Sequence, residues 1–194
     1  MYKIIAHLKS SSPLSFSKYY NVPKKDQESP AIYEQRTWRE RLHYDASGEV
    51  LIPPMAFKKC IENAASYLSV KIEGKRNQTY TKKFKAATIC SEKVMLGINK
   101  EDVESEILFV PSDGKPGGGT RVEKTFPLIH EWQGVVVFYV LDNTITPEVF
   151  EYHLREAGKF IGIGRFRPIN GGFYGRFNVE KIDVQEMDNE LEVA

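Results

Sequence analysis

The segment from Gly162 to Arg176 carries the residue types in this chain that are best suited to holding a ligand. Glycines permit positive φ angles and let a second backbone approach closely. Guanidinium groups match phosphate oxygens in a bidentate geometry, and aromatic rings can stack on bases. The segment therefore predicts a site for a nucleic-acid backbone, made of Gly164, Arg165, Arg167, Gly171, Gly172, Phe173, Tyr174 and Arg176.

The same segment has a purely structural interpretation, in which it is a turn and its arginines pair with acidic residues of the C-terminal half. It is not a dinucleotide fingerprint, because the third glycine is missing and the segment follows a predicted helix. No Gly-Lys-Ser/Thr sequence is present, so it is not a phosphate-binding P-loop either. We expect its arginines to face solvent or ligand and Phe166 to lie in the core.

Two further segments combine basic and aromatic residues. The first, from Lys71 to Lys85, has no core pattern and predicts a phosphate-tracking surface or, alternatively, a solvated loop; its candidate contacts are Lys75, Arg76, Tyr80, Lys82 and Lys83. The second runs from Arg36 to Arg41 and contains Trp38 and Arg39. On a strand, Trp38 would point away from Arg39, and it could either cap the core or stack on a base.

Catalytic and metal-binding patterns are weak. The four histidines, His7, His43, His130 and His153, are scattered and form no zinc-ligand spacing. No Gly-x-Ser-x-Gly nucleophile motif occurs. We therefore expect no metal, no cofactor and no metabolic enzyme. A metal-independent RNA cleavage by one histidine stays open as an alternative, because acid and base can come from distant segments.

Charge is distributed unevenly along the 194 residues. Residues 1–85 hold 16 Lys and Arg against 8 Asp and Glu, whereas residues 86–194 hold 11 against 18. Such an asymmetry favours a basic binding face, although a solvated surface would look the same. The two cysteines are too few for a disulfide framework, and the longest apolar run, Val135–Leu141, is too short to span a bilayer. We expect a cytoplasmic protein with no membrane partner.

Hydrophobic periodicity and helix-start signals predict an α+β fold. Two helices are expected, at Pro54–Leu68 and Pro147–Ala157, and each begins with proline in its first turn. The remaining segments read as strands or loops: Lys9–Leu51 shows no helical period, and Ala86–Ile98 reads as a strand. The order predicts a ferredoxin-like βαββαβ antiparallel sheet with both helices on one face. We expect one domain over residues 1–185, with insertions at about 10–50 and 111–127, and an acidic tail at 186–194.

This arrangement resembles the RAMP superfamily, the ferredoxin-like RNA-binding proteins of CRISPR effector complexes and their solitary relatives. The resemblance lies in the helix entry Leu51-Ile52-Pro53-Pro54, in the glycine-rich loop Gly162–Gly175, and in long insertions at Pro13–Val50 and Pro111–Pro127. It implies binding of single-stranded RNA, with loop arginines on phosphates and self-association of copies along the strand. The chain is shorter than most backbone subunits of these complexes, and it shows one ferredoxin-like unit where the processing enzymes carry two.

Our main hypothesis is a single-stranded nucleic-acid-binding protein, with RNA favoured over DNA by the resemblance alone. The first alternative is a phage-encoded inhibitor of host defence that acts by protein interaction or by sequestering a nucleotide. The second is the metal-independent RNA endonuclease.

Overall fold

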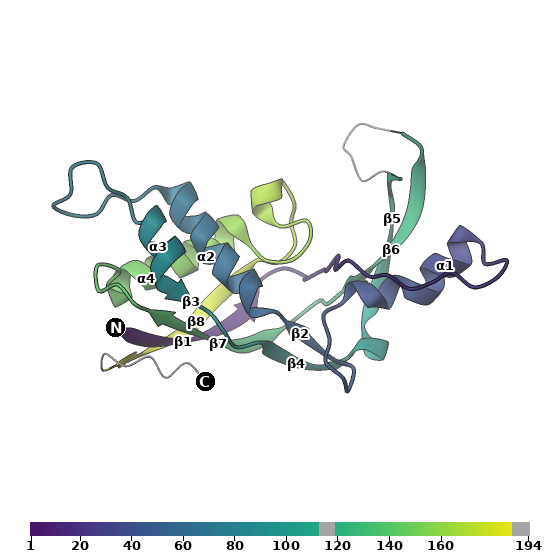
Figure 1. Cartoon of the computed structure of the whole chain (residues 1–194), viewed down its shortest axis with the longest axis horizontal. Coiled ribbons are helices and arrows are strands. Elements are labelled where there is room, and N and C mark those ends of the chain that lie inside the picture. Colours follow the sequence, from purple (N-terminus) through teal and green to yellow (C-terminus); the bar gives the residue numbers. More distant parts are fainter. Residues whose placement is uncertain (113–118, 188–194) are drawn as a thin grey trace.

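The chain forms an elongated molecule in a computed structural model that describes residues 1–112 and 119–187 (Figure 1). One half holds a sheet covered by helices, and the other half holds a short helix and a projecting hairpin. Residues 113–118 of the predicted second insertion and residues 188–194 of the predicted acidic tail lie outside the described residues. Within the described residues, no helix is long and apolar enough to cross a membrane.

The central sheet has the order β3-β7-β1-β8, with antiparallel neighbours. Its strands are β1 (Tyr2–Ser10), β3 (Thr88–Ile89), β7 (Gln133–Val140) and β8 (Phe177–Glu186). Side chains alternate across a strand, so Ile4, Ala6 and Leu8 of β1 are all buried beneath the helices. This order, with helices between the first two and the last two strands, confirms the predicted ferredoxin-like fold.

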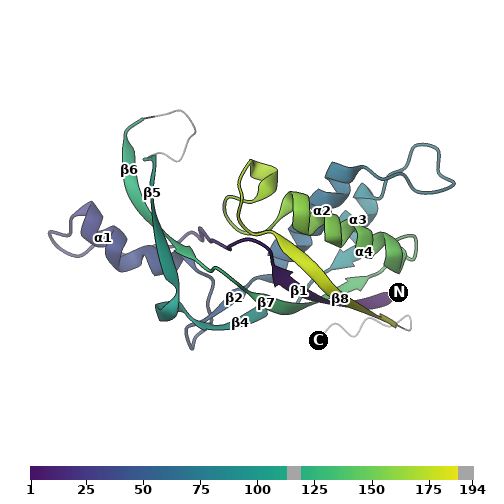
Figure 2. The same cartoon turned by 180° about the vertical axis from the view of Figure 1, so that it is seen from behind.

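The helices α2 (Pro54–Leu68), α3 (Thr81–Ala87) and α4 (Pro147–Glu156) cover one face of this sheet (Figures 1 and 2). The apolar stripe of α2 is buried as its spacing predicts, and Thr146 caps α4 by accepting a hydrogen bond from the Val149 amide. A π-helical turn, Ala157–Ile161, extends α4. The predicted bounds of α2 are confirmed, and α4 ends one residue before the predicted Ala157.

A 3₁₀ turn at Pro168–Asn170 precedes β8, and the other elements lie between β1 and α2 and between β3 and β7. The first interval holds α1 (Pro30–Thr37), a 3₁₀ turn (Trp38–Arg41) and β2 (Glu49–Ile52). The second holds β4 (Val94–Asn99), a 3₁₀ turn (Lys100–Asp102), β5 (Glu104–Pro111) and β6 (Arg121–Leu128). Strand β2 pairs with β4, and β5 pairs with β6 in an antiparallel hairpin.

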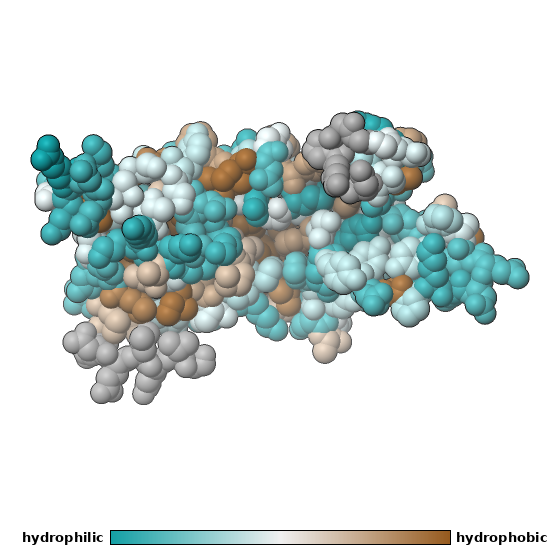
Figure 3. Space-filling view, turned by 45° about the horizontal axis from the view of Figure 1, so that its top comes forward, coloured by the Kyte–Doolittle hydropathy of each residue, from teal (hydrophilic) through white to brown (hydrophobic). Residues whose placement is uncertain are grey.

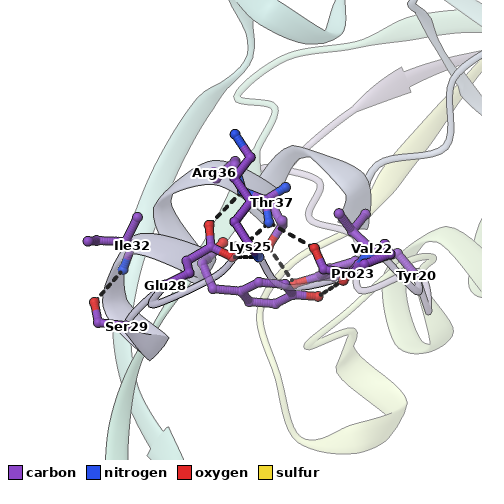
Figure 4. A network of polar contacts seen from close by, with 10 residues as sticks. Tyr20, Val22, Pro23, Lys25, Glu28, Ser29, Ile32, Arg36 and Thr37 are labelled. Atoms are coloured by element: carbon purple, nitrogen blue, oxygen red, sulfur yellow. Dashed lines mark hydrogen bonds and ion pairs between the residues drawn. The ribbon is translucent and has the colours of Figure 1, made fainter.

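Helix α1 corrects the expectation that Lys9–Leu51 contains no helix. It lacks an apolar stripe because most of its side chains are exposed, and local polar contacts hold it instead (Figure 4). Ser29 Oγ accepts a hydrogen bond from the Ile32 amide, and Arg36 forms an ion pair with Glu28 at 2.7 Å. Hydrogen bonds of this kind leave no periodic signal in the hydrophobic pattern.

Three other expectations about local structure are wrong. Trp38 lies in a 3₁₀ turn and not on a strand. The single strand expected over Ala86–Ile98 is divided into β3 and β4, which belong to different sheets. The segment Lys71–Lys85 contains three core residues, Ile72, Tyr80 and Phe84. They lie partly in a loop and partly in the short helix α3, so their spacing follows no single periodic pattern.

Candidate functional site

A cleft of about 560 Å³ lies where the glycine-rich loop, the β5–β6 hairpin and the segment after β1 meet. Figure 1 shows the loop that leads into β8 and the hairpin standing on the same side of the molecule. The cleft contains four basic and four aromatic side chains, namely Lys18, Arg41, Lys124, Arg165, Tyr19, Tyr20, Phe126 and Phe166. Ser17, Val110 and Pro111 complete its lining.

Arg165 joins the glycine-rich loop to the hairpin. Its guanidinium forms an ion pair with Glu106 of β5, donates a hydrogen bond to Ser15 Oγ at 3.1 Å, and lies 3.7 Å from the centre of the Phe126 ring. Glu106 also accepts a 2.7 Å hydrogen bond from the Tyr174 hydroxyl. Burial lowers the pKa of Arg165 and raises that of Tyr174.

These contacts show that Arg165 does not face open solvent, although it lines the cleft. Its side chain is 12% exposed and that of Glu106 is 17% exposed, so the pair is largely removed from water. For this arginine the structural interpretation holds, since it pairs with an acidic residue of the C-terminal half. The pairing needs the hairpin to place Glu106 beside the loop, 59 residues away in sequence.

Arg41 has the matching role on the opposite wall of the cleft. Its guanidinium binds Glu34 of α1 at 2.8 Å and donates a 2.7 Å hydrogen bond to the Tyr20 hydroxyl. Glu34 in turn accepts a hydrogen bond from the Thr125 amide of β6 at 2.9 Å. This chain of contacts fixes α1, the Tyr20 segment and the hairpin relative to one another.

Lys18 and Lys124 differ from the two arginines. Across residues 1–112 and 119–187, neither ammonium group forms an ion pair with a carboxylate, and Lys18 Nζ lies 4.9 Å from the centre of the Tyr44 ring. The two arginines are compensated by Glu34 and Glu106. The lysines are therefore the cations of the cleft that a negatively charged ligand can reach without displacing a carboxylate.

The glycine-rich loop is ordered by backbone hydrogen bonds to the segment after β1. The Arg165 amide donates to the Ser15 carbonyl and the Gly175 amide donates to the Pro13 carbonyl, both at 2.8 Å. Gly175 has a φ of 73°, and a Cβ at this position would lie 1.8 Å from the Ile163 carbonyl oxygen. The loop is thus a rigid part of the site, closed at its base by a glycine.

Gly175→Ala is expected to lower the free energy of unfolding by well over about 1 kcal/mol, because both the φ angle and the carbonyl contact oppose a side chain. Gly171→Ala is the matched control: its φ is 75°, but a Cβ there meets nothing within 4 Å. It should cost only the conformational strain, about 1 kcal/mol. Chemical denaturation measures both, and equal losses would contradict the close packing at the base of the loop.

Phe166 lies at the mouth of the cleft and corrects the expectation that it belongs to the core. Its φ is 51°, in the left-handed region that bulky residues rarely adopt, and its side chain is 47% exposed. The ring lies 4.6 Å from the Arg165 guanidinium carbon. The positive φ turns the ring away from the core, where Ile163 is buried instead. Strain of this kind is concentrated at functional sites.

The other predicted loop residues lie around the tip and the far side of the loop. Arg176 donates from Nε to the Lys159 carbonyl at 3.2 Å and from Nη1 to the Phe173 carbonyl at 2.7 Å. The Nε atom of Arg167 is buried and has no hydrogen-bond partner within the described part of the chain. Gly171 and Phe173 are exposed, while Gly164, Gly172 and Tyr174 are partly buried.

The basic segment Lys71–Lys85 does not contribute to the cleft. It forms the loop and short helix at the end of the helical half that is remote from the hairpin (Figure 1). Lys75, Arg76 and Lys82 are exposed there. Lys83 pairs with Asp142 at 2.6 Å, and the hydrogen bond that Lys83 donates is the main reason that the pKa of Asp142 falls to about 2.

Tyr80 and Trp38 are placed by core packing. Tyr80 is buried with its ring 5.8 Å from His153 and 6.5 Å from Phe84, so the expectation that it stacks on a base is wrong. Trp38 is also buried, and the Arg39 guanidinium lies 4.2 Å from its ring centre. Of the two interpretations left open for Trp38, the structure supports the one in which it caps the core.

Sequence reasoning missed most of the cleft. Lys18, Tyr19, Tyr20 and Lys124 were not expected, and Arg41 was noted only as a neighbour of Trp38. The run Lys18-Tyr19-Tyr20 is the one local signal that could have pointed to the site, since it joins a cation to two rings. Lys124 carries no such signal, because only the hairpin register turns it toward the cleft.

The described residues contain no group of three or more His, Cys, Asp or Glu side chains that could hold a metal ion. Nor does a histidine line the described cleft. His153 is buried among aromatic rings, and burial lowers its pKa. The chemistry available in the cleft is therefore the binding of anions by ammonium groups and the stacking of planar groups on rings.

Known family models and curated proteins give no match to this chain. Among solved structures, a chain of the type III-B Cmr-beta complex bound to cognate target RNA is similar, with a TM-score of 0.56 and 13% identity. That match covers 94% of this chain and 60% of the other. Cmr6 from Pyrococcus furiosus has a TM-score of 0.49 and 14% identity, over 91% and 97% of the two chains. The similarity to the Cmr-beta chain is one of fold, and it agrees with the predicted ferredoxin-like architecture.

Proposed function

We propose that this chain is a member of the RAMP superfamily that binds single-stranded RNA in the cleft between the glycine-rich loop and the β5–β6 hairpin. The observation that carries the proposal is the meeting of four basic side chains and four aromatic rings in one cleft. Basic grooves lined with aromatic rings are the general means of holding single strands, because the cations follow the phosphates and the rings stack on the bases.

The four basic side chains of the cleft have two different roles in this proposal. Lys18 and Lys124 bind phosphates, while Arg41 and Arg165 mainly hold the walls in place through Glu34 and Glu106. Tyr19 and Phe166 present exposed rings to bases at the mouth of the cleft. None of these contacts distinguishes one base from another by hydrogen bonds, so we propose that the chain binds RNA with little sequence preference.

The choice of RNA over DNA rests on the comparison. The similar Cmr-beta structure is one bound to its target RNA, and the shared fold places a glycine-rich loop before the last strand in this chain. We further propose that several copies bind side by side along one strand. The histidine-based endonuclease gains no support from the cleft, whose described lining contains no histidine.

Titration of the purified chain with labelled single-stranded RNA over a range of salt concentrations tests the proposal. Each phosphate neutralised by a lysine releases counterions, so the logarithm of affinity should fall with the logarithm of salt concentration, by about 0.7 per contact. Two accessible lysines therefore predict that a plot of log affinity against log salt concentration has a slope of about −1.4 or steeper. Single-stranded DNA and duplex RNA are the comparison ligands. An affinity independent of salt, or no binding at all, would refute the proposal.

Phe166→Gly separates binding from stability. Glycine adopts the φ of 51° without strain, so the free energy of unfolding should change by less than about 1 kcal/mol, whereas a core phenylalanine contributes about 3–5 kcal/mol. Loss of a stacking ring should weaken RNA binding by about 1–3 kcal/mol. Denaturation and titration of the same preparation measure both quantities. A large loss of stability with normal binding would place this ring in the core.

A further inference from the structure

Two groups of aromatic rings, one on the glycine-rich loop and one on the helices, lie on either side of Arg176. Phe166 lies 6.5 Å from Tyr174, and Tyr174 lies 6.2 Å from Phe173, measured between ring centres. The Arg176 guanidinium lies 5.4 Å from the Phe173 ring and is fixed by the Lys159 carbonyl. Phe160 follows directly in sequence, and its ring lies 5.8 Å from that of Tyr67 at the end of α2.

Four of the five rings of this series are exposed, whereas Tyr174 is partly buried and binds Glu106 through its hydroxyl. The exposed fractions are 47% for Phe166, 59% for Phe173, 45% for Phe160 and 61% for Tyr67. Figure 3 shows several brown apolar patches on the surface between the hydrophilic ends of the molecule. Large exposed rings on neighbouring elements are typical of a binding surface, since their exposure to water is unfavourable.

We propose that this series, which we call the aromatic track, binds the bases of a single strand that leaves the cleft and crosses the glycine-rich loop toward α2. The inference rests on the proposed function, because the track begins at Phe166, which also lines the cleft. The occupant follows from that continuity and from Arg176. A cation between exposed rings suits a strand whose phosphates alternate with bases.

The charges beside the track are compatible with a polyanion. Lys159, the neighbour of Phe160 in sequence, is paired with Glu156 at 2.8 Å, so this carboxylate is compensated. Arg176 makes its hydrogen bonds to carbonyl oxygens and forms no ion pair within the described residues. Its positive charge is thus left for a phosphate.

The track predicts a longer binding site than the cleft alone. Oligouridines of about 4 and about 12 nucleotides span the range of site sizes found for single-strand binders. The variant Tyr67→Leu/Phe160→Leu keeps apolar area but removes two stacking faces. We expect it to bind the long strand roughly tenfold more weakly than the unaltered chain, and to bind the short strand equally well.

Two controls complete the experiment. Tyr152→Leu removes a ring of similar exposure on α4 that is not part of the track, and it should leave both affinities unchanged. Tyr67→Trp/Phe160→Trp retains the stacking faces and should bind the long strand normally. Thermal melts of all variants confirm that the fold is kept.

The outcomes separate this inference from the function on which it rests. If the unaltered chain binds no oligonucleotide, the proposed function itself fails. If it binds the long strand and the leucine variant binds it equally well, the function stands and the track is wrong. Loss of self-association in the leucine variant, seen by sedimentation with RNA binding unchanged, would identify the surface as a protein interface and would also overturn the track.

Discussion

Arg165→Ala is expected to lower the free energy of unfolding by about 3 kcal/mol. Its main effect is therefore on stability and not on ligand binding. Removing the guanidinium leaves the Glu106 carboxylate largely buried, with the Tyr174 hydroxyl as its remaining partner within the described residues. Breaking one side of a buried ion pair usually costs about 3–5 kcal/mol, and the lower value applies here because both side chains keep some contact with water. The melting temperature should fall by roughly 6–12 °C.

The double variant Arg165→Ala/Glu106→Ala is the control for this result. It removes the unpaired carboxylate as well, so it should be more stable than Arg165→Ala alone. Arg176→Ala provides a second comparison, because Arg176 binds carbonyl oxygens near the surface and its loss should cost less than about 1.5 kcal/mol. A melting temperature of Arg165→Ala equal to that of the unaltered chain would show that Arg165 faces solvent, as the sequence alone suggests.

Lys18→Glu/Lys124→Glu is expected to weaken binding of single-stranded RNA by at least about 100-fold while the fold is retained. Each lysine is a cation without a carboxylate partner in the described structure, so each is free to bind a phosphate. Two charge-assisted contacts of about 1.5–3 kcal/mol each are lost, and each glutamate then repels the backbone. The slope of log affinity against log salt should become shallower by about 1.4.

The matched control reverses two charges at the far end of the molecule. Lys75→Glu/Lys82→Glu changes the net charge by the same amount on the exposed basic segment, so it separates the effect of net charge from the effect of charges in the cleft. We expect this pair to bind within about threefold of the unaltered chain, because its lysines lie remote from the cleft. If the control pair loses binding and the cleft pair retains it, the basic segment is the site and the cleft is not.

The elements that sequence predicted well are those whose signals are local. The residues Phe57, Cys60, Ile61, Ala64 and Ala65 form a stripe that only a helix can present to one side, and α2 has the predicted bounds. The start of α4 is also a local signal, because Thr146 is a typical N-cap residue and proline follows it. The ferredoxin-like order followed from these helices and from the strands around them.

Sequence failed where distant residues decide the conformation. Nothing local shows that Phe166 adopts a positive φ, since only glycine is expected there, and the hydrophobic pattern consequently placed its ring in the core. In the sequence, Arg165 has no acidic neighbour and is interpreted as a free cation, whereas in the structure the hairpin places Glu106 beside it. Helix α1 escaped notice because its contacts are polar and its apolar pattern is absent.

The amino-acid sequence by itself determined helices α2 and α4 and the ferredoxin-like order of the elements around them, because periodicity and capping act over a few positions. Only the tertiary structure decided which charges remain available. Arginines 41 and 165 are compensated by carboxylates from other elements, while lysines 18 and 124 are brought together without them. The physical reason is that an ion pair depends on distance in space, which strand register and loop closure set, and not on separation along the chain.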